Sequence, residues 1–442
     1  MNSILPPKAS ATEEILLKIA IVLGLGALLY LMIYGRVFQP LLDAASAHRW
    51  THAIVRPSAI WILMGTFMLV FRTVLLFRYK EKAAAEFASA PMLTVIIPAY
   101  NEGPMVAQTI DSVAQANYPR DRLEIFVIDD GSKDDTWEHI SAAARRHANV
   151  VTPLRFAKNQ GKRAALEAGF TRARGEIAVT IDSDSVIEPQ TLLEMAGPFR
   201  EPKVGAVAGK VAAFNRRNGI FPRMLHVRFI LSFDMLRAIQ STYGTVYCCP
   251  GALSAYRLSA VHKVLHDWSK QTFMGVPCTF GEDRAMTNMI LAEGFDTVYQ
   301  RNAVVHTIVP ETYVKLTRMF LRWERSYVRE EWKFLSSVLW KRPWKTRWIS
   351  IIDSFFTNMR FPMIYVTLAM LVTLVMSDPF TLLRLLVAIG LMSTFYMLYY
   401  LRSEKSPDFV YGIAYAYFAF FTLFWIFPYA VLTVRARSWL TR

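Results

Sequence analysis

Long apolar runs lie near both ends of this chain and predict membrane-spanning helices. Each run is close to the roughly 20 residues that one crossing needs. Lys18 and Arg72 are the only charged residues in the first two runs. We therefore expect two spans within residues 1–85 and about three within residues 348–442. The apolar runs occupy residues 15–34, 59–77, 351–376, 380–401 and 409–434.

The segment from residue 92 to residue 310 has the pattern of an α/β domain. Short β-branched runs alternate with stretches that have helical periodicity, which predicts a doubly wound, mostly parallel sheet. Ligands bind at the carboxyl ends of the strands in such a sheet. The expected strands are residues 93–98, 124–130, 149–154, 177–182 and 204–211, and the expected helices are residues 106–115, 136–145, 162–173 and 224–240.

Residues 311–347 form a third pattern, in which basic and apolar side chains fall on separate helical stripes. An amphipathic helix over residues 313–332 typically lies in a membrane interface. A second interpretation stays open for Arg322 and Trp323: the guanidinium can clamp a diphosphate and the indole can form a sugar platform. The basic stripe contains Lys315, Arg318, Arg322, Arg325 and Arg329, and the apolar stripe contains Leu316, Phe320, Trp323 and Tyr327.

Composition supports a membrane protein and not a nucleic-acid-binding one. The 442 residues are 53% hydrophobic and carry a net charge of +15, and the basic residues lie beside apolar runs, as expected for an anionic membrane surface. No nucleic-acid-binding motif accompanies the charge. Arg78, Lys80 and Lys82 after the second run place the α/β domain on the cytoplasmic side of an inner membrane. Five spans would put the basic C-terminal end outside, so one span is expected to be re-entrant or interfacial.

Two carboxylates, Asp182 and Asp184, close the run I-A-V-T-I-D-S-D in residues 177–184. Strand alternation would place both on one side of the sheet. Oxygen ligands suit Mg²⁺ or Mn²⁺, which complete their shells with substrate phosphates. Taken alone, such a pair is more often a solvated turn, but polar residues also follow the other strands.

The other strand ends carry groups suited to a nucleotide sugar. Ala99, Tyr100 and Glu102 follow the first strand, and Tyr100 can stack on or border a base. Asp129 and Asp130 follow the second strand, where a carboxylate can accept hydrogen bonds from uracil or ribose. Lys162 begins a helix, where backbone amides and an ammonium favour phosphate. A solvated first turn is the alternative for Lys162.

Residues 280–284, F-G-E-D-R, place Glu282 and Asp283 at an expected helix start. Such a pair can simply balance the helix dipole. The functional interpretation is a general base at Asp283, with Glu282 on the acceptor side. Gly251 lies in a Pro-Gly break upstream and is a further acceptor-side candidate.

Taken in order, the motifs V-I-I-P-A-Y-N-E, V-I-D-D-G-S, N-Q-G-K-R, D-S-D, G-E-D-R and R-W resemble those of the processive family 2 β-glycosyltransferases, nearest to hyaluronan synthases and rhizobial chitin-oligosaccharide synthases. The resemblance implies a GT-A fold and a UDP-sugar donor. It further implies Asp130, with Asp129, at the uridine, Asp184 at the metal, Asp283 as base, and Arg322 with Trp323 closing the site over donor and acceptor. Asp182 and Lys162 are donor-side candidates from their places at the strand ends.

This chain departs from the family pattern at two places. Met319 stands where the family usually has Gln, which bears on acceptor or gating contacts. Pro250, Gly251 and Ala252 replace S-G-P, which bears on sugar and primer preference.

The expected activity is an inverting polymerisation of a β-linked, GlcNAc-containing glycan from UDP-sugars, UDP-GlcNAc being favoured, with export of the chain through the protein's own spans. Accessory export proteins are a further partner class. Two alternatives stay open: a non-processive transferase that acts on a lipid acceptor, and a membrane sensor with a degenerate nucleotide-sugar domain. The joint presence of Asp130, Asp184 and Asp283 argues against a sensor.

One polar stripe within an expected span bears on export. Asp353, Thr357 and Arg360 recur at helical spacing and share one face. Ionisable groups in a span typically face a protein interior or a water-filled path. The stripe therefore predicts the wall of a sugar channel, with an ion pair or snorkelling arginine as the alternative.

Overall fold

The computed structural model describes residues 57–436, in which the chain forms two compact units. The smaller unit contains helix α4, residues 223–231 and residues 349–424. The larger unit contains residues 79–222, 232–348 and the described residues from 425 onward. Before residue 57, the structure describes isolated helical positions: Thr12, Ile15, Leu16, Ile19, Val22, Leu23, Gly26, Tyr30 and Tyr34.

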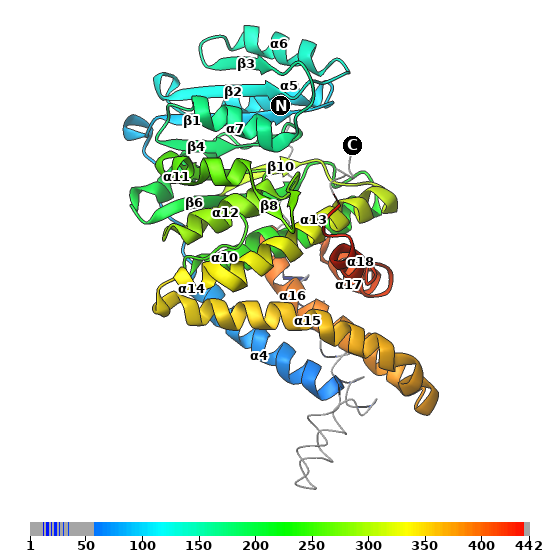
Figure 1. Ribbon diagram of the computed structural model, residues 1–442. Coiled ribbons are helices and arrows are strands. Elements are labelled where there is room, and N and C mark those ends of the chain that lie inside the picture. The colour runs from blue at the N-terminus through cyan, green and yellow to red at the C-terminus, as the bar shows by residue number, and fades with distance from the viewer. Residues whose placement is uncertain are drawn as a thin grey trace. The chain divides into compact units, whose positions relative to one another are not determined.

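The core of the larger unit is an eight-stranded sheet in the order β3-β2-β1-β4-β7-β6-β10-β5 (Figure 1). Strand β1 is buried at every position, because helices cover both faces of a parallel sheet. The strands are β1 Leu93–Ala99, β2 Leu123–Asp129, β3 Val151–Arg155, β4 Ile177–Thr180, β5 Ser185–Ile187, β6 Val204–Ala213, β7 Ser254–Arg257 and β10 Asp296–Thr307.

The sheet is parallel in its first half and mixed in its second. Strands β3, β2, β1 and β4 pair in parallel, which confirms the doubly wound arrangement expected from the alternating pattern. Strand β7 is antiparallel to both β4 and β6, and β5 is antiparallel to β10. The carboxyl ends of β1, β2 and β4 therefore open on one edge.

Helices form two groups around this sheet. Helices α5 and α6 contact each other, while α7 contacts α11 and α11 contacts α12. Right-handed crossovers put α5 and α6 on the face opposite α7. The helices are α5 Met105–Ala114, α6 Thr136–Arg146, α7 Lys162–Arg172, α8 Thr191–Ala196, α11 Leu258–Ser269 and α12 Glu282–Ala292, and a small hairpin joins β8 Thr272–Phe273 to β9 Val276–Pro277.

The expected helix over residues 224–240 is longer and interrupted. Helix α9 spans Ile220–Phe229, a π-helical turn spans Ile230–Met235, and α10 spans Leu236–Ser241. A π-helical turn has an extra residue per turn, which a 3.6-residue pattern does not reveal.

Helix α13, Tyr313–Lys333, forms where the amphipathic pattern predicted a helix. Its expected basic face is not uniformly exposed, because Arg325 and Arg329 are buried. Arg325 donates to the hydroxyl of Thr433 at 3.1 Å, near helix α18, Ile426–Leu432, which packs on α13. The stripe is therefore partly a protein contact and not only a face for headgroups. A π-helical turn, Phe334–Val338, and helix α14, Leu339–Lys341, follow.

The smaller unit is built from long helices. They are α4 Pro57–Arg78, α15 Trp344–Ser377, α16 Phe380–Glu404 and α17 Phe409–Thr422. Within the described residues, Trp344–Thr373 and Phe380–Glu404 are long and apolar enough to cross a membrane, and α17 with α18 forms a third candidate bent by 50°. The expectation that one of five spans is re-entrant or interfacial stays a prediction. The expected span at residues 15–34 lies outside the described residues, apart from isolated positions.

The polar stripe of α15 makes a helix contact that the channel hypothesis did not anticipate. Asp353 is buried and accepts hydrogen bonds from the Arg72 guanidinium at 3.0 and 3.1 Å. Arg72 also donates to the hydroxyl of Thr357 at 2.7 Å. Arg360 is exposed and its guanidinium lies 4.6 Å from the Phe361 ring. Two of the three stripe residues therefore join α15 to α4.

Candidate active site

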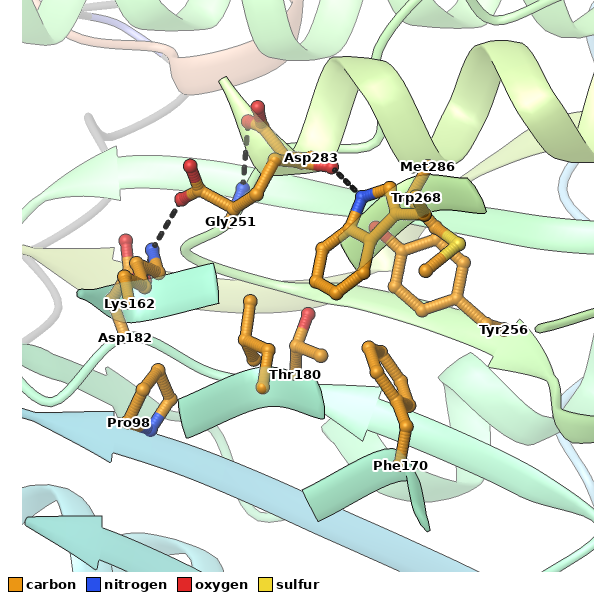
Figure 2. Close-up of a pocket in the computed structure, with 12 residues that line it drawn as sticks. Pro98, Lys162, Phe170, Thr180, Asp182, Gly251, Tyr256, Trp268, Asp283 and Met286 are labelled. Carbon is orange, nitrogen blue, oxygen red and sulfur yellow. Dashed lines mark hydrogen bonds and ion pairs between the residues drawn. The ribbon is translucent and has the colours of Figure 1, made fainter. Parts of the chain in front are cut away.

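Some of the expected site residues line a small cavity. Its walls combine an apolar floor with a charged rim (Figure 2). The rim contains Lys162, Asp182, Glu282 and Asp283, which come from α7, the turn after β4, and the start of α12. The floor includes Pro98, Leu166, Phe170, Thr180, Tyr256, Trp268 and Met286.

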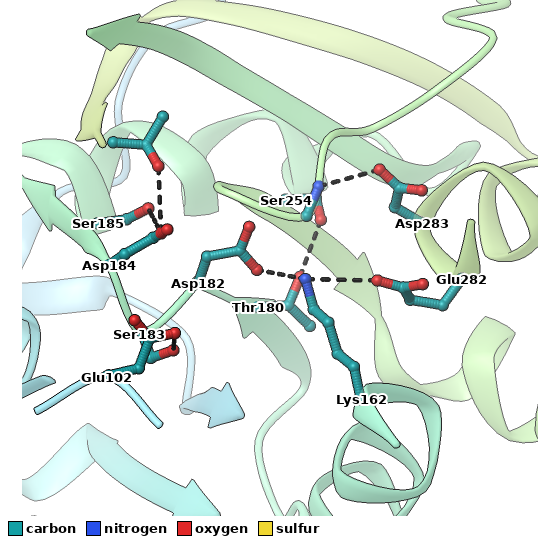
Figure 3. A network of polar contacts seen from close by, with 12 residues as sticks. Glu102, Lys162, Thr180, Asp182, Ser183, Asp184, Ser185, Ser254, Glu282 and Asp283 are labelled. Atoms are coloured by element: carbon teal, nitrogen blue, oxygen red, sulfur yellow. Dashed lines mark hydrogen bonds and ion pairs between the residues drawn. The ribbon is translucent and has the colours of Figure 1, made fainter. Parts of the chain in front are cut away.

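Asp182 and Asp184 lie in a turn, because β4 ends at Thr180. Strand alternation therefore does not apply to them, and the prediction that they share one side for that reason was wrong. Asp182 forms an ion pair with the Lys162 ammonium. Asp184 accepts hydrogen bonds from the hydroxyls of Ser185 and Thr307, each at 3.2 Å. The two carboxylates have different neighbours (Figure 3).

Lys162 is positioned by a loop that Asp130 holds. Gly161 precedes helix α7 with φ of 92°, a conformation that glycine adopts without strain. The Asp130 carboxylate accepts the backbone amides of Gln160 at 2.7 Å and Gly161 at 2.8 Å. Burial raises the pKa of Asp130, and these two hydrogen bonds oppose the rise. Both oxygens of Asp130, expected at the uridine, thus already bind the protein's own loop.

Other expected donor residues lie at the same edge. Asp129 is buried, accepts the amide of Ser132 at 2.9 Å and pairs with Arg155 at 3.1 Å. Glu102 accepts the hydroxyl of Ser183, within the D-S-D turn, at 2.7 Å. Ala99 ends β1 and is buried, and Tyr100 follows it half-buried.

Glu282 and Asp283 begin α12 side by side and make different contacts. Glu282 is buried, and its carboxylate lies 3.3 Å from the Lys162 ammonium. Asp283 accepts the Gly251 amide at 3.2 Å and lies 3.6 Å from the Cys248 sulfur. Lys162 therefore bridges Asp182 and Glu282, while Asp283 faces the Gly251 loop (Figure 3).

The surroundings drive the pKa values of these two carboxyls apart. Burial and the neighbouring Glu282 charge raise the pKa of Asp283. Burial would also raise the pKa of Glu282, but Lys162, Arg163 and Arg322 together bring it below its ordinary value. Asp283 is therefore the member of the pair with the higher proton affinity. Such a division is typical of acid and base roles.

Gly251 lies where a side chain would crowd the rim. A Cβ atom there would stand 2.9 Å from the Lys162 nitrogen and 3.5 Å from Asp182. The Gly251 amide donates a hydrogen bond to Asp283, and the residue lies close to the Lys162 ammonium. The expected acceptor-side glycine therefore lies between Asp283 and Lys162.

Two residues at the site were not predicted. Burial raises the pKa of the Cys248 thiol to about 12, with Asp283 adding to the rise, so this thiol stays protonated beside the carboxylate. The Trp268 indole donates to the Glu282 carbonyl at 2.9 Å and fixes the first turn of α12. Neither is among the site residues predicted from the sequence, since sequence spacing does not reveal contacts between distant segments.

Arg322 and Trp323 lie on α13 and are half-buried. The Trp323 ring packs edge-on against Phe233 at 6.1 Å and Phe320 at 5.7 Å. Arg322 acts on the rim through its charge, which lowers the pKa of Glu282. This charge interaction joins Arg322 of the R-W motif to Glu282, the first residue of α12.

The donor set fits a hard cation that a substrate helps to hold. Within residues 57–436, no group of three or more His, Cys, Asp or Glu side chains could hold a metal alone. Mg²⁺ in phosphate sites is typically bound through one or two carboxylates plus substrate oxygens. Asp184, whose carboxylate accepts from two hydroxyls, is a carboxylate of the kind such a site needs, and Asp182 forms an ion pair with Lys162.

Comparison with known proteins shows which family this domain is similar to. A family model described as "Glycosyl transferase family 2" matches residues 94–265. N-acetylglucosaminyltransferases from Rhizobium leguminosarum bv. viciae and Rhizobium meliloti (strain 1021) are each 35% identical over 246 residues, which is 54% of this chain and 56% of theirs. The chain spans about half the length of the curated relatives it matches.

A solved structure shares the fold. The mannosyltransferase PcManGT from Pyrobaculum calidifontis, solved with GDP-Man and Mn²⁺, superposes with a TM-score of 0.58 at 22% identity, covering 83% of this chain and 99% of that one. The fold is thus that of the GT-A glycosyltransferases. The matched family region ends before Glu282, Asp283 and α13, so their roles rest on geometry.

Proposed function

We propose that this protein is a membrane-embedded, inverting glycosyltransferase that polymerises a β-linked, GlcNAc-containing chain from UDP-sugars, since residues 94–265 match the family model described as "Glycosyl transferase family 2". The observation that carries the proposal is the rim at the sheet edge, where Lys162, Asp182, Glu282 and Asp283 converge. The rhizobial relatives support GlcNAc as the sugar.

Asp283 is the proposed base. An acceptor hydroxyl gives its proton to the Asp283 carboxylate as its oxygen bonds to the anomeric carbon, and the bond from that carbon to the UDP oxygen breaks on the opposite face. The raised pKa of Asp283 favours proton uptake. Gly251, through its amide, holds the carboxylate towards the acceptor side.

Lys162 is the proposed partner of the donor diphosphate. Its ammonium already bridges two carboxylates, so an incoming diphosphate competes with Asp182 and Glu282 for it. Asp184 would hold Mg²⁺ or Mn²⁺, which supplies positive charge to the departing UDP. Tyr100, Asp129 and Asp130 form the proposed uridine side, with Asp130 acting largely through the loop before Lys162.

Trp323 and Arg322 are the proposed closing residues on α13. The indole is braced by two aromatic edges, which suits a rigid stacking surface for a sugar. The membrane helices would export the product into the opposite compartment. The stripe of Asp353 and Thr357 no longer supports that step, because Arg72 binds both.

The test is release of UDP by the purified full-length protein in detergent, with Mn²⁺ or Mg²⁺. A panel of UDP-GlcNAc, UDP-Glc and GDP-Man is compared between wild type and Asp283→Asn. We expect UDP-GlcNAc to be used fastest and Asp283→Asn to lose about 10² to 10⁴ in rate, the usual value of a positioned base, while still binding UDP. If Asp283→Asn loses UDP affinity in step with its rate, Asp283 is structural and the base lies elsewhere.

A further inference from the structure

A buried charged network joins α13 to the start of α12 outside the substrate-facing rim. Glu330 on α13 is fully buried. One carboxylate oxygen accepts the Gln271 amide at 2.8 Å and the Arg329 guanidinium at 2.9 Å. The other accepts the Asn288 amide of α12 at 3.2 Å. Removing either partner of a buried ion pair is costly, so the group is fixed in place.

Arg329 carries this network to the turn that precedes the proposed base. Its guanidinium donates to the Phe280 carbonyl at 2.5 Å and lies 5.5 Å from the Phe280 ring. The next residue, Gly281, has φ of 76°, and a Cβ atom there would overlap the Ser326 hydroxyl of α13. Helix α13 therefore contacts Phe280 and Gly281, the two residues immediately before Glu282.

The same network reaches the other support of this turn. Gln271 lies three residues after Trp268, and its carbonyl accepts the Cys278 amide at 3.0 Å. Trp268 in turn donates to the Glu282 carbonyl. The start of α12 is thus contacted by Trp268 and, through Phe280, by Arg329. Arg329 binds Glu330 directly, while the Trp268 carbonyl accepts the backbone amide of Gln271 at 3.4 Å.

We propose that Glu330 is a positioning residue for Asp283: through Arg329, Gln271 and Asn288 it fixes the Phe280–Gly281 turn and so the place of the Asp283 carboxylate. The proposal rests on the function proposed above. Glu330 follows Trp323 by seven residues, which puts both on one side of α13.

The test uses Glu330→Gln in the full-length protein, with Glu293→Gln as the control. Glu293 is exposed at the end of α12, so the control removes the same charge from a neighbouring helix. We expect Glu330→Gln to lower kcat on the order of 100-fold, the loss that about 1 Å of misplacement can cause, while KM for UDP-sugar and affinity for UDP stay unchanged. Glu293→Gln should match wild type.

Hydrogen exchange supplies a readout that does not depend on transfer. Amides in residues 278–285 should exchange faster in Glu330→Gln, with the central strands unaffected. If Glu330→Gln fails to fold, the double variant Arg329→Met/Glu330→Met removes both buried charges and should fold with the same local exchange and kcat loss.

Two results would overturn the proposal. One is a folded Glu330 variant whose kcat and local exchange equal those of Glu293→Gln. The other is a loss in which UDP affinity and exchange throughout the sheet change together, which would make Glu330 a stability residue. If wild type uses no UDP-sugar, the proposed function fails, while the exchange result still reports whether Glu330 fixes the turn.

Discussion

Adjacent residues Glu282 and Asp283 acquire opposite acid-base behaviour from their contacts. Glu282 meets Lys162, and Asp283 meets a backbone amide and a protonated thiol. The sequence predicted the pair but not this division, because Lys162 and Gly251 are distant along the chain.

The pH dependence of turnover should report this division. Asp283 acts as a base only when ionised, so activity falls as pH drops through its raised pKa. Glu282→Gln removes a negative charge that raises that pKa. The acid limb of the kcat profile should therefore shift to lower pH, and the variant should lose less activity than Asp283→Asn. An acid limb that stays in place, or moves to higher pH, would show that Glu282 does not act on the base.

Asp184 is the residue on which the metal proposal depends. Asp184→Asn keeps the size of the side chain but removes the charge that a hard cation needs. The variant should remain folded in the membrane and lose transfer, and excess EDTA should abolish wild-type transfer. Calorimetric titration of Mn²⁺ in the presence of UDP checks binding directly. Full turnover by Asp184→Asn, or by wild type in EDTA, would exclude a metal role.

Sequence patterns predicted the elements that are locally determined. Strands β1, β2 and β4 and helices α6, α7 and α13 lie close to their expected bounds, because apolar runs and helical periodicity reflect burial directly. Strand β10 was not predicted, because its apolar pattern is interrupted by Asp296, Gln300, Arg301 and Asn302. The register of its pairing with β6 also shifts between Gln300 and Val304. Strand β7 was missed because it is short and pairs antiparallel with two strands.

Site residues were predicted better than their contacts. The strand-end rule located Asp130, Lys162 and Asp182 at one edge. It could not reveal that Asp130 accepts two amides of the loop before Lys162, since that bond forms only when β2 and the loop meet. Buried polar side chains often accept hydrogen bonds from backbone amides of distant segments, and local sequence patterns do not predict these partners.

The contact between α4 and α15 makes a prediction about stability. The Arg72 and Asp353 ion pair is largely buried, with side-chain exposures of 16% and 2%. Asp353→Leu alone leaves an uncompensated guanidinium and should cost about 3 to 5 kcal/mol. The double variant Arg72→Leu/Asp353→Leu should cost much less. Thermal unfolding in one detergent compares them, and a double variant as unstable as the single one would show that the pair does not act as a unit.

The described residues combine a sheet whose region matches the glycosyl transferase family 2 model with helices long and apolar enough to cross a membrane. Transfer at a membrane surface and polymerisation of a hydrophilic chain are separate claims, and the second distinguishes this proposal from a single transfer to a lipid acceptor. Product length separates them, because a processive enzyme retains its acceptor between additions.

Mass spectrometry of the products made by purified full-length protein from UDP-GlcNAc alone, with Asp283→Asn as the inactive control, tests the central claim most directly. We predict a ladder of products that differ by one GlcNAc residue, made by wild type and absent from Asp283→Asn. A single sugar attached to a lipid, a ladder that persists in Asp283→Asn, or no product from UDP-GlcNAc would contradict the account.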